Sequence, residues 1–351
     1  MTADKEQIHK RDWDRETVAL LALSSMKGVG YWTLYKMASQ GIKFEEVIKA
    51  STSFEQFEGY LTQVGSRVPK TEEKTWEVFQ RELWSDGNRL YKELKFADVK
   101  VRHFDEPAFP EKLKEIQEPP RWLFIQGNES LLRKKSIAIV GTRKPTEDGI
   151  FLANYIGACV SYFDTVTVSG LAYGIDQIIH QQSIRFNVPT IAVLGTGIFL
   201  DYPAGSEVPR KSILSHNGAI ITEYLPHQSY SAQNFVRRNR LQAGLSEIVI
   251  PAQWKAKSGT SHTVRYAVEG NKKVFCLRLP NGNHRQDDWL ELADQLKLSI
   301  FTIPGEENKL IKAISENIPR ILADSYHATI PTNKKYDSDL QSSLADQLSL
   351  F

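Results

Sequence analysis

The feature that most constrains the fold is a series of short apolar segments that begins at Ser136, with stretches of helical length between them. Each segment is apolar on both faces, which is typical of strands in a parallel sheet covered by helices on both sides. The alternation therefore predicts an α/β fold with a doubly wound, mostly parallel, Rossmann-like sheet over residues 136–280. The predicted strands are SIAIVG (136–141), TVTVSG (165–170), TIAVLG (190–195), AIITE (219–223), EIVIPA (247–252) and KVFCLRL (273–279).

Residues 1–98 have a different pattern, in which apolar side chains recur at helical spacing. Gly28-Val29-Gly30 interrupts the pattern and predicts a turn between two helices, as in a SAM-like or helix-hairpin-helix domain. Backbone N–H groups at the start of the second helix can hold a phosphate, but an ordinary helical hairpin fits the same pattern. We therefore predict a small N-terminal helical domain and leave its ligand open.

Three further segments complete the predicted organisation. Residues 99–135 form a proline-rich connection and sheet extension, in which Pro119-Pro120 prevents helix continuation and residues 122–126 are extended. Residues 281–330 are predicted as a C-terminal helix-strand-helix appendage, with KLSIFTI as its strand. Residues 331–351 are predicted as a polar tail.

Charge and composition exclude several classes of protein. In 351 residues, 44 Lys+Arg against 42 Asp+Glu leave a net charge of +2, so an anion-binding surface must be a local cluster. Cys159 and Cys276 lie far apart in apolar segments, which predicts buried reduced thiols. The polar N-terminus and the lack of an apolar run of about 20 residues predict a cytoplasmic protein without a membrane segment. Neither a metal nor a cofactor is expected.

The candidate site lies at the carboxyl ends of the predicted strands, where open parallel sheets bind their ligands. Glycines and small hydroxyl residues recur there, and glycine lets the backbone approach an anion closely. Their spacing matches neither the dinucleotide-binding G-x-G-x-x-G motif nor a Walker A loop, so NAD, FAD and an ATPase are disfavoured. The candidate residues are Gly141, Thr142, Arg143, Ser169, Gly170, Ser258, Gly259 and Thr260.

The segment NFVRRNRLQAGLS (234–246) concentrates positive charge where a helix is expected to begin. Arginine binds phosphate bidentately and an aromatic ring stacks on a base, so the pattern favours an anionic, unsaturated ligand. A solvated basic helix face is the alternative, and one arginine is a candidate partner for a carboxylate such as Glu223. The candidate residues in this segment are Phe235, Arg237, Arg238, Asn239 and Arg240.

Six segments together resemble, in order and spacing, the DNA-processing protein A family (DprA, also called Smf) over roughly residues 109–280. The resemblance implies a SAM-like domain before a Rossmann-like domain and sequence-independent binding of single-stranded DNA, without catalysis. It also implies a homodimer, and loading of a RecA-type recombinase during natural transformation. The segments are FPEKLKEIQEPPRWLFIQGN, AIVGTR, SGLAYGIDQIIH, IAVLGTGIFLDYP, FVRRNRLQAGLS and SGTSHTVRYAVEGNKKVF.

The resemblance also assigns roles to individual residues. Arg143 and Ser169-Gly170 would contact backbone phosphates, and Phe235 would contact a base. Three residues of the RNR motif would contact phosphates or shape the pocket: Arg238, Asn239 and Arg240.

The sequence departs from the family pattern at several positions, which marks a divergent member. Tyr173 stands where the family often has Lys or Arg, so a charge is lost and a stacking surface is gained. Gln253 replaces an acid, and Lys255 and Lys257 add positive charge nearby. Recombination, repair and phage defence are alternatives to a role in transformation.

A second hypothesis is a nucleotide-sensing protein or a nucleoside-monophosphate hydrolase that binds a small nucleotide at the same strand ends. Asp176 and His180 lie four residues apart at a predicted helix start and face the same way, and Glu223 ends a strand. Asp176 or Glu223 would act on the glycosidic bond, whereas a helix-capping carboxylate and a packed histidine are the structural alternative. The P-G-G-x-G-T-x-x-E motif of such hydrolases is missing, which favours DNA. A protein-binding scaffold is a third hypothesis.

Overall fold

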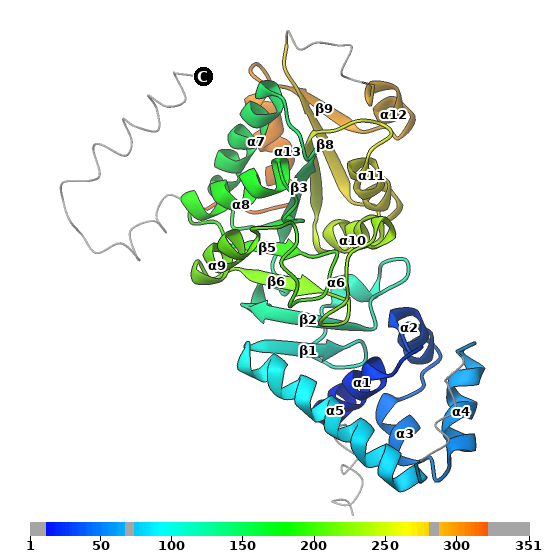
Figure 1. The fold of residues 1–351 in the computed structure, drawn as a ribbon. Coiled ribbons are helices and arrows are strands. Elements are labelled where there is room, and N and C mark those ends of the chain that lie inside the picture. The colour runs from blue at the N-terminus through cyan, green and yellow to red at the C-terminus, as the bar shows by residue number, and fades with distance from the viewer. Residues whose placement is uncertain (1–11, 67–73, 281–287, 322–351) are drawn as a thin grey trace, which may run out of the picture.

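The strands form one mixed sheet in the part of the chain that the structure, a computed structural model, describes: residues 12–66, 74–280 and 288–321 (Figure 1). The strand order is β1-β2-β6-β5-β4-β3-β7-β8-β9, and all neighbours from β6 to β9 are parallel. The antiparallel pairs are β1 with β2 and β2 with β6. The bounds are β1 Val99–His103, β2 Trp122–Gly127, β3 Ser136–Gly141, β4 Val166–Ser169, β5 Thr190–Val193, β6 Ala219–Thr222, β7 Ile248–Gln253, β8 Lys273–Arg278 and β9 Ser299–Thr302.

The topology confirms the predicted doubly wound, mostly parallel sheet. From β3 the chain steps outward through β4, β5 and β6, and then returns across β3 to β7 and β8. The direction of winding therefore reverses between β3 and β7, which places a crevice at the carboxyl ends of these central strands. The six predicted strands correspond to β3–β8, and the predicted extended segment 122–126 lies in β2.

Helices cover both faces of the sheet because both faces of its central strands are apolar. One buried cluster joins α7, α8 and α13 to side chains such as Ile139 and Ile250. A second cluster joins α6, α10, α11 and α12 to the opposite face, which includes Val140 and Val168. The bounds are α6 Glu111–Lys114, α7 Glu147–Cys159, α8 Ile175–Arg185, α9 Glu207–Ser215, α10 Ala232–Leu245, α11 Gly259–Glu269, α12 Leu290–Gln295 and α13 Glu307–Ser315, with short 3-10 helices η1 Glu129–Arg133 and η2 Val160–Tyr162.

The predicted C-terminal appendage is part of the sheet where the structure describes it. Strand β9 pairs in parallel with β8, and α13 packs into the same apolar cluster as α7 and α8. Helix α12, strand β9 and helix α13 follow the predicted helix-strand-helix order, and their apolar side chains are buried against the sheet. The predicted polar tail 331–351 lies outside the described residues.

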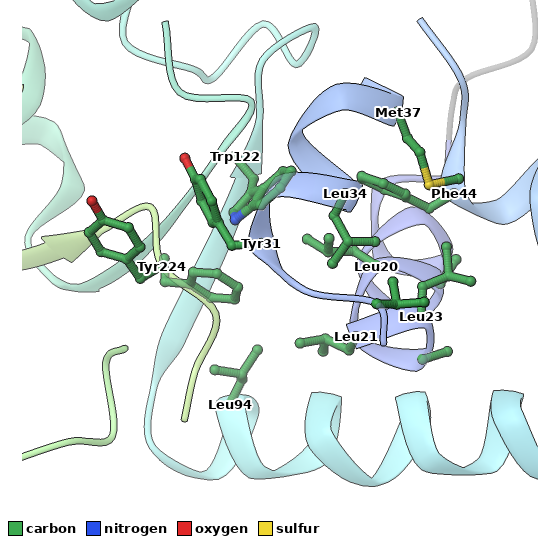
Figure 2. Close-up of a cluster of buried hydrophobic side chains, with 14 of the residues drawn as sticks. Leu20, Leu21, Leu23, Tyr31, Leu34, Met37, Phe44, Leu94, Trp122 and Tyr224 are labelled. Carbon is green, nitrogen blue, oxygen red and sulfur yellow. The ribbon is translucent and has the colours of Figure 1, made fainter. Parts of the chain in front are cut away.

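The N-terminal helices share a hydrophobic cluster with one end of the sheet (Figure 2). Tyr31 lies between Trp122 of β2 and Tyr224, which follows β6, with ring centroids 5.6 and 5.2 Å away. Leu20 and Leu94 belong to the same cluster. The five helices are α1 Trp13–Ser25, α2 Tyr31–Ser39, α3 Phe44–Lys49, α4 Phe54–Gln63 and α5 Trp76–Phe96.

Two smaller findings bear on the sequence analysis. Cys159 and Cys276 are both buried free thiols, as predicted. Among the helices of the described residues, none combines the length and apolar composition that crossing a bilayer requires.

Candidate nucleic-acid interface

A shallow pocket opens at the carboxyl ends of β3, β4 and β5, and we call it the rim pocket. The loops after these three strands supply most of its wall, and the first turn of α10 supplies Phe235. Four residues predicted for the site therefore meet here: Arg143, Gly170, Tyr173 and Phe235. The remaining lining residues are Ala172, Leu194, Gly195, Tyr202 and Pro203.

Aromatic rings gather around Phe235. The ring of Tyr202 lies 5.1 Å from that of Phe235 and 4.4 Å from that of Tyr230. The guanidinium carbon of the exposed Arg143 lies 5.0 Å from the Phe235 ring centre. Tyr230 is 56% exposed. The rim pocket therefore presents aromatic surface beside a free cation, which suits a base and its phosphate.

Phe235 is held in this place by local sequence. The Ser231 hydroxyl caps α10 by accepting a hydrogen bond from the backbone N–H of Asn234 at 3.0 Å, so Phe235 belongs to the first turn of the helix. Its ring lies directly over Gly195, where any β-carbon would overlap the ring. The Phe235 ring can occupy this position only because residue 195 has no side chain.

Arg238 lies beneath the rim pocket rather than on its surface. Its side chain is only 4% exposed, and Nη1 donates to the carbonyls of Gly170, at 2.8 Å, and Val193. A β-carbon on Gly170 would lie 2.6 Å from the Arg238 guanidinium and from the Asp176 carboxylate. The resemblance offered a phosphate contact or a role in shaping the pocket, and this placement fits the second, because the buried guanidinium links the ends of β4 and β5.

Asp176 and His180 are also buried under the rim pocket. Burial raises the pKa of the Asp176 carboxyl, while Arg238, the Ser169 hydroxyl and nearby backbone groups oppose that rise. Burial lowers the pKa of His180 to about 3, and its Nδ1 lies 2.8 Å from the Thr190 hydroxyl. These contacts favour the structural interpretation of the pair over a catalytic one.

Arg240 forms a buried ion pair with Glu223, the carboxylate that the sequence analysis offered as a partner. Its Nη1 and Nη2 donate to the two carboxylate oxygens at 2.5 and 2.6 Å. The Tyr31 hydroxyl donates to the same carboxylate at 2.6 Å. Burial opposes charge on Glu223, but Arg240 holds the pKa of this carboxyl below its usual value. This is the structural role that the sequence left open for one of the arginines.

Arg237 points away from the rim pocket, towards α2. It pairs with the exposed carboxylate of Glu118. Its guanidinium lies over the rings of Trp32 and Tyr35, at 4.6 and 4.8 Å.

The other predicted residues occupy the neighbouring strand ends but do not line the rim pocket. Ser169 is buried and donates to the Ile139 carbonyl at 2.7 Å, and Asn239 donates to the Gly259 carbonyl at 2.9 Å. The Thr142 amide donates to the Gln253 carbonyl at 2.8 Å. Further members of this group are Gly141, at the end of β3, and Ser258 and Thr260, at the start of α11.

Sequence reasoning missed Tyr202 and Tyr230 as members of the site. Tyr202 lies in the loop that follows the glycines after β5, and Tyr230 directly precedes α10. Their position in loops next to predicted rim residues was the available signal. Because no regular pattern relates residues 202, 230 and 235, only the folded chain shows that their rings meet.

No carboxylate lines the rim pocket among the described residues, and both Asp176 and Glu223 are buried with cationic partners. The fold and the pocket together define a Rossmann-like α/β protein that presents aromatic rings and a cation at its strand ends.

Comparison with known families matches residues 100–308 to DNA recombination-mediator protein A, and the chain belongs to this family. It is 35% identical to protein Smf of Synechocystis sp. over 59% of this chain and 56% of that protein. The chain thus spans little more than half the length of this relative.

Two solved structures share the fold. DNA processing protein A from Streptococcus pneumoniae is similar with a TM-score of 0.60 at 23% identity, over 82% of this chain and 94% of that one. DNA processing protein A from Helicobacter pylori is similar with a TM-score of 0.54 at 26% identity, over 63% of this chain and 97% of that one. The latter structure concerns a mode of single-stranded DNA binding.

Proposed function

We propose that this protein binds single-stranded DNA without sequence preference at the rim pocket and acts there as a recombination mediator. The observation that carries the proposal is the group formed by Arg143, Phe235, Tyr202 and Tyr230. Single strands are held by cations along the backbone and by aromatic rings on which bases stack, whatever the base. Family membership and the DNA-binding relative from Helicobacter pylori support the same function.

Each part of the group has its own role in this proposal. Phe235 supplies the stacking surface, and Tyr202 and Tyr230 position its ring and extend the surface outward. Arg143 neutralises a phosphate beside the stacked base. Arg238 is a positioning residue, because it bridges the carbonyls of Gly170 and Val193 that shape the pocket from below.

The wider role follows from the family rather than from the pocket. We propose that the protein acts as a homodimer and loads a RecA-type recombinase onto the bound strand, in natural transformation or in a related recombination or defence process. A test is filament assembly by such a recombinase on a strand coated with single-strand-binding protein. Faster assembly with this protein supports loading, and an unchanged rate contradicts it.

The hydrolase alternative has no support from the geometry. General acid–base catalysis requires a group within hydrogen-bond reach of the reacting atom. Glu223 is only 1% exposed, and Arg240 and Tyr31 bind its two oxygens. We therefore propose no enzymatic activity for this site.

The binding experiment is fluorescence anisotropy with a labelled oligothymidylate of a few tens of bases, against the matching duplex, at two salt concentrations. Wild type should bind the single strand more tightly than the duplex. Its affinity should fall steeply as the salt concentration rises, because neutralised phosphates release counterions on binding. Arg143→Ala should weaken binding to all sequences alike and lower the salt slope by about 1. Arg89→Ala, which removes an exposed cation from α5, is the matched control and should bind like wild type.

Either of two results would contradict the proposal. Absence of binding at low salt removes single-stranded DNA as the ligand. Equal affinities for Arg143→Ala and Arg89→Ala would show that the strand does not pass the rim pocket.

A further inference from the structure

The outward side of α2 carries a second aromatic and cationic surface, separate from the rim pocket. We call it the α2 surface, and it consists of Trp32, Tyr35 and Lys36 with Arg237 beside them. Trp32 is 53% exposed, and Lys36 is also exposed. Because residues three and four apart share a helix face, Trp32, Tyr35 and Lys36 point the same way. The α2 helix lies at the end of the helical region that meets the sheet (Figure 1).

Trp32 is fixed in its exposed position by contacts on its inner side. The guanidinium of Arg237 lies 4.6 Å over its ring, and the Tyr35 ring meets it edge-on at 5.7 Å. Tyr31, the preceding residue, is anchored by its hydrogen bond to Glu223. A large apolar ring held in solvent loses little conformational freedom when a flat ligand stacks on it, so the arrangement suits binding.

Arg237 is a mostly buried cation in this arrangement, with 11% of its side chain exposed. It pairs with the exposed carboxylate of Glu118, and its Nε lies 3.7 Å from a carboxylate oxygen of Glu223. Nε and Nη2 are themselves buried and have no hydrogen-bond partner within the described part of the chain. Arg237 therefore contributes positive charge from behind the Trp32 ring.

Helix α10 connects the α2 surface with the rim pocket. Phe235 and Arg237 are two residues apart on this helix, about 3 Å along its axis and on nearly opposite sides. A strand that contacts both surfaces would therefore have to pass around the start of α10.

The character of the α2 surface favours nucleic acid over a protein partner. An exposed tryptophan alone would fit either ligand. Here two cations, Lys36 and Arg237, lie beside the Trp32 ring. A third, Arg121, donates a hydrogen bond to the hydroxyl of Ser39, the last residue of α2. Glu118 and the buried Glu223 are the carboxylates that pair with Arg237. The excess of positive charge around a stacking ring is what a single strand requires.

We propose that the α2 surface is a second contact for the single strand, in which Trp32 stacks on a base outside the rim pocket. Lys36, which is exposed, neutralises a neighbouring phosphate, and Arg237 adds positive charge from behind the ring. This inference rests on the proposed function, because the strand is placed by the rim pocket first. It also gives the turn at Gly28-Val29-Gly30 a role, since that turn places Trp32 at the start of α2.

The test is the affinity of Trp32→Ala for oligothymidylates of increasing length, measured by anisotropy at fixed salt. Oligonucleotides too short to leave the rim pocket should bind the variant and wild type equally. Longer ones should bind Trp32→Ala about 5- to 150-fold more weakly, the range expected for one stacked base. Trp32→Phe, which keeps an aromatic ring, should lose much less affinity for the longer oligonucleotides. Phe96→Ala removes an aromatic side chain that is 96% exposed at the end of α5 and should have no effect.

The outcomes separate this inference from the proposed function. If Trp32→Ala binds long oligonucleotides like wild type while Arg143→Ala weakens them, the α2 surface does not bind DNA and the rim pocket does. If wild type binds no oligonucleotide, both proposals fail. Unfolding midpoints of all variants, measured in urea, show whether a loss of binding follows from a loss of fold.

Discussion

Replacing Glu223 by glutamine tests how much the buried Arg240–Glu223 pair, which joins α10 to the segment after β6, stabilises the fold. Glutamine keeps the size of the side chain but removes its charge. Arg240 then remains buried without its bidentate partner, although it still donates to the carbonyls of Glu118 and Arg237. Tyr31 can still donate to the amide oxygen. Glutamine has one acceptor oxygen where the carboxylate has two, so the change removes the charge and also one acceptor of the Arg240 and Tyr31 hydrogen bonds.

The expected cost follows from the burial of the pair. Removing one partner of a buried ion pair typically costs about 3–5 kcal/mol, because the other charge is left uncompensated. Two backbone acceptors remain for Arg240, so we expect about 3 kcal/mol, the lower end of that range. This is a large share of the roughly 5–15 kcal/mol by which a folded domain is stable.

The assay is urea unfolding at pH 7, followed by circular dichroism, for wild type, Glu223→Gln, Arg240→Met and the double variant. The midpoint should fall in both single variants while the slope stays constant. The double variant should recover part of the loss, because it leaves no charge buried without a partner. A cost below about 1 kcal/mol for Glu223→Gln, or a double variant at the sum of the two single losses, would refute the reasoning.

Acidification provides a second measurement on the same pair. The folded pKa of Glu223 lies below its unfolded value of 4.5, so its stabilisation is complete above that pH and is lost as the pH falls through the folded pKa. Wild type should therefore lose more stability than Glu223→Gln when the pH drops below that value. Parallel losses in the two proteins would show that Glu223 is not held in its charged form.

Three other predictions concern the rim pocket and the residues beneath it. Phe235→Ala should lower the affinity for a single strand by about 1–3 kcal/mol and leave the salt slope unchanged in anisotropy titrations. Gly195→Ala should weaken binding in the same assay because its new methyl group displaces the Phe235 ring, whereas Gly59→Ala, with open space around it on α4, should not. The folded pKa of His180 is about 3, below its unfolded value of 6.5. The stability of wild type should therefore decrease as the pH is lowered from 6.5 towards 3, because only the unfolded chain takes up a proton on this histidine. In urea unfolding, His180→Asn should lose less stability than wild type over this pH range, and an equal loss in both proteins would contradict the assignment.

The sequence predicted part of the candidate site. Arg143 and Phe235, which line the rim pocket, were singled out because glycine-rich strand ends and an aromatic residue beside arginines are local patterns. The sequence also offered Glu223 as the partner of one arginine but did not show which one. Arg237 and Arg240 lie on the side of α10 that approaches Glu223, and Arg238 lies on another side. Which side meets solvent, a carboxylate or another helix depends on the packing of α10.

The sequence by itself determined the class of fold and the family. Strands that are apolar on both faces, separated by helical segments, leave few arrangements other than a parallel sheet covered on both sides. The sequence also predicted that the candidate site lies at the carboxyl ends of the strands, since βα loops bind ligands in such sheets.

Only the tertiary structure decided which charges are free. Arg238 and Arg240 are neutralised by Asp176 and Glu223, carboxylates from other segments of the chain, whereas Arg143 remains exposed. The tertiary structure also brought Tyr202 and Tyr230 to Phe235, and Trp32 to Arg237. Long-range contacts of this kind have no period in the sequence, because they arise from the packing of whole elements against one another.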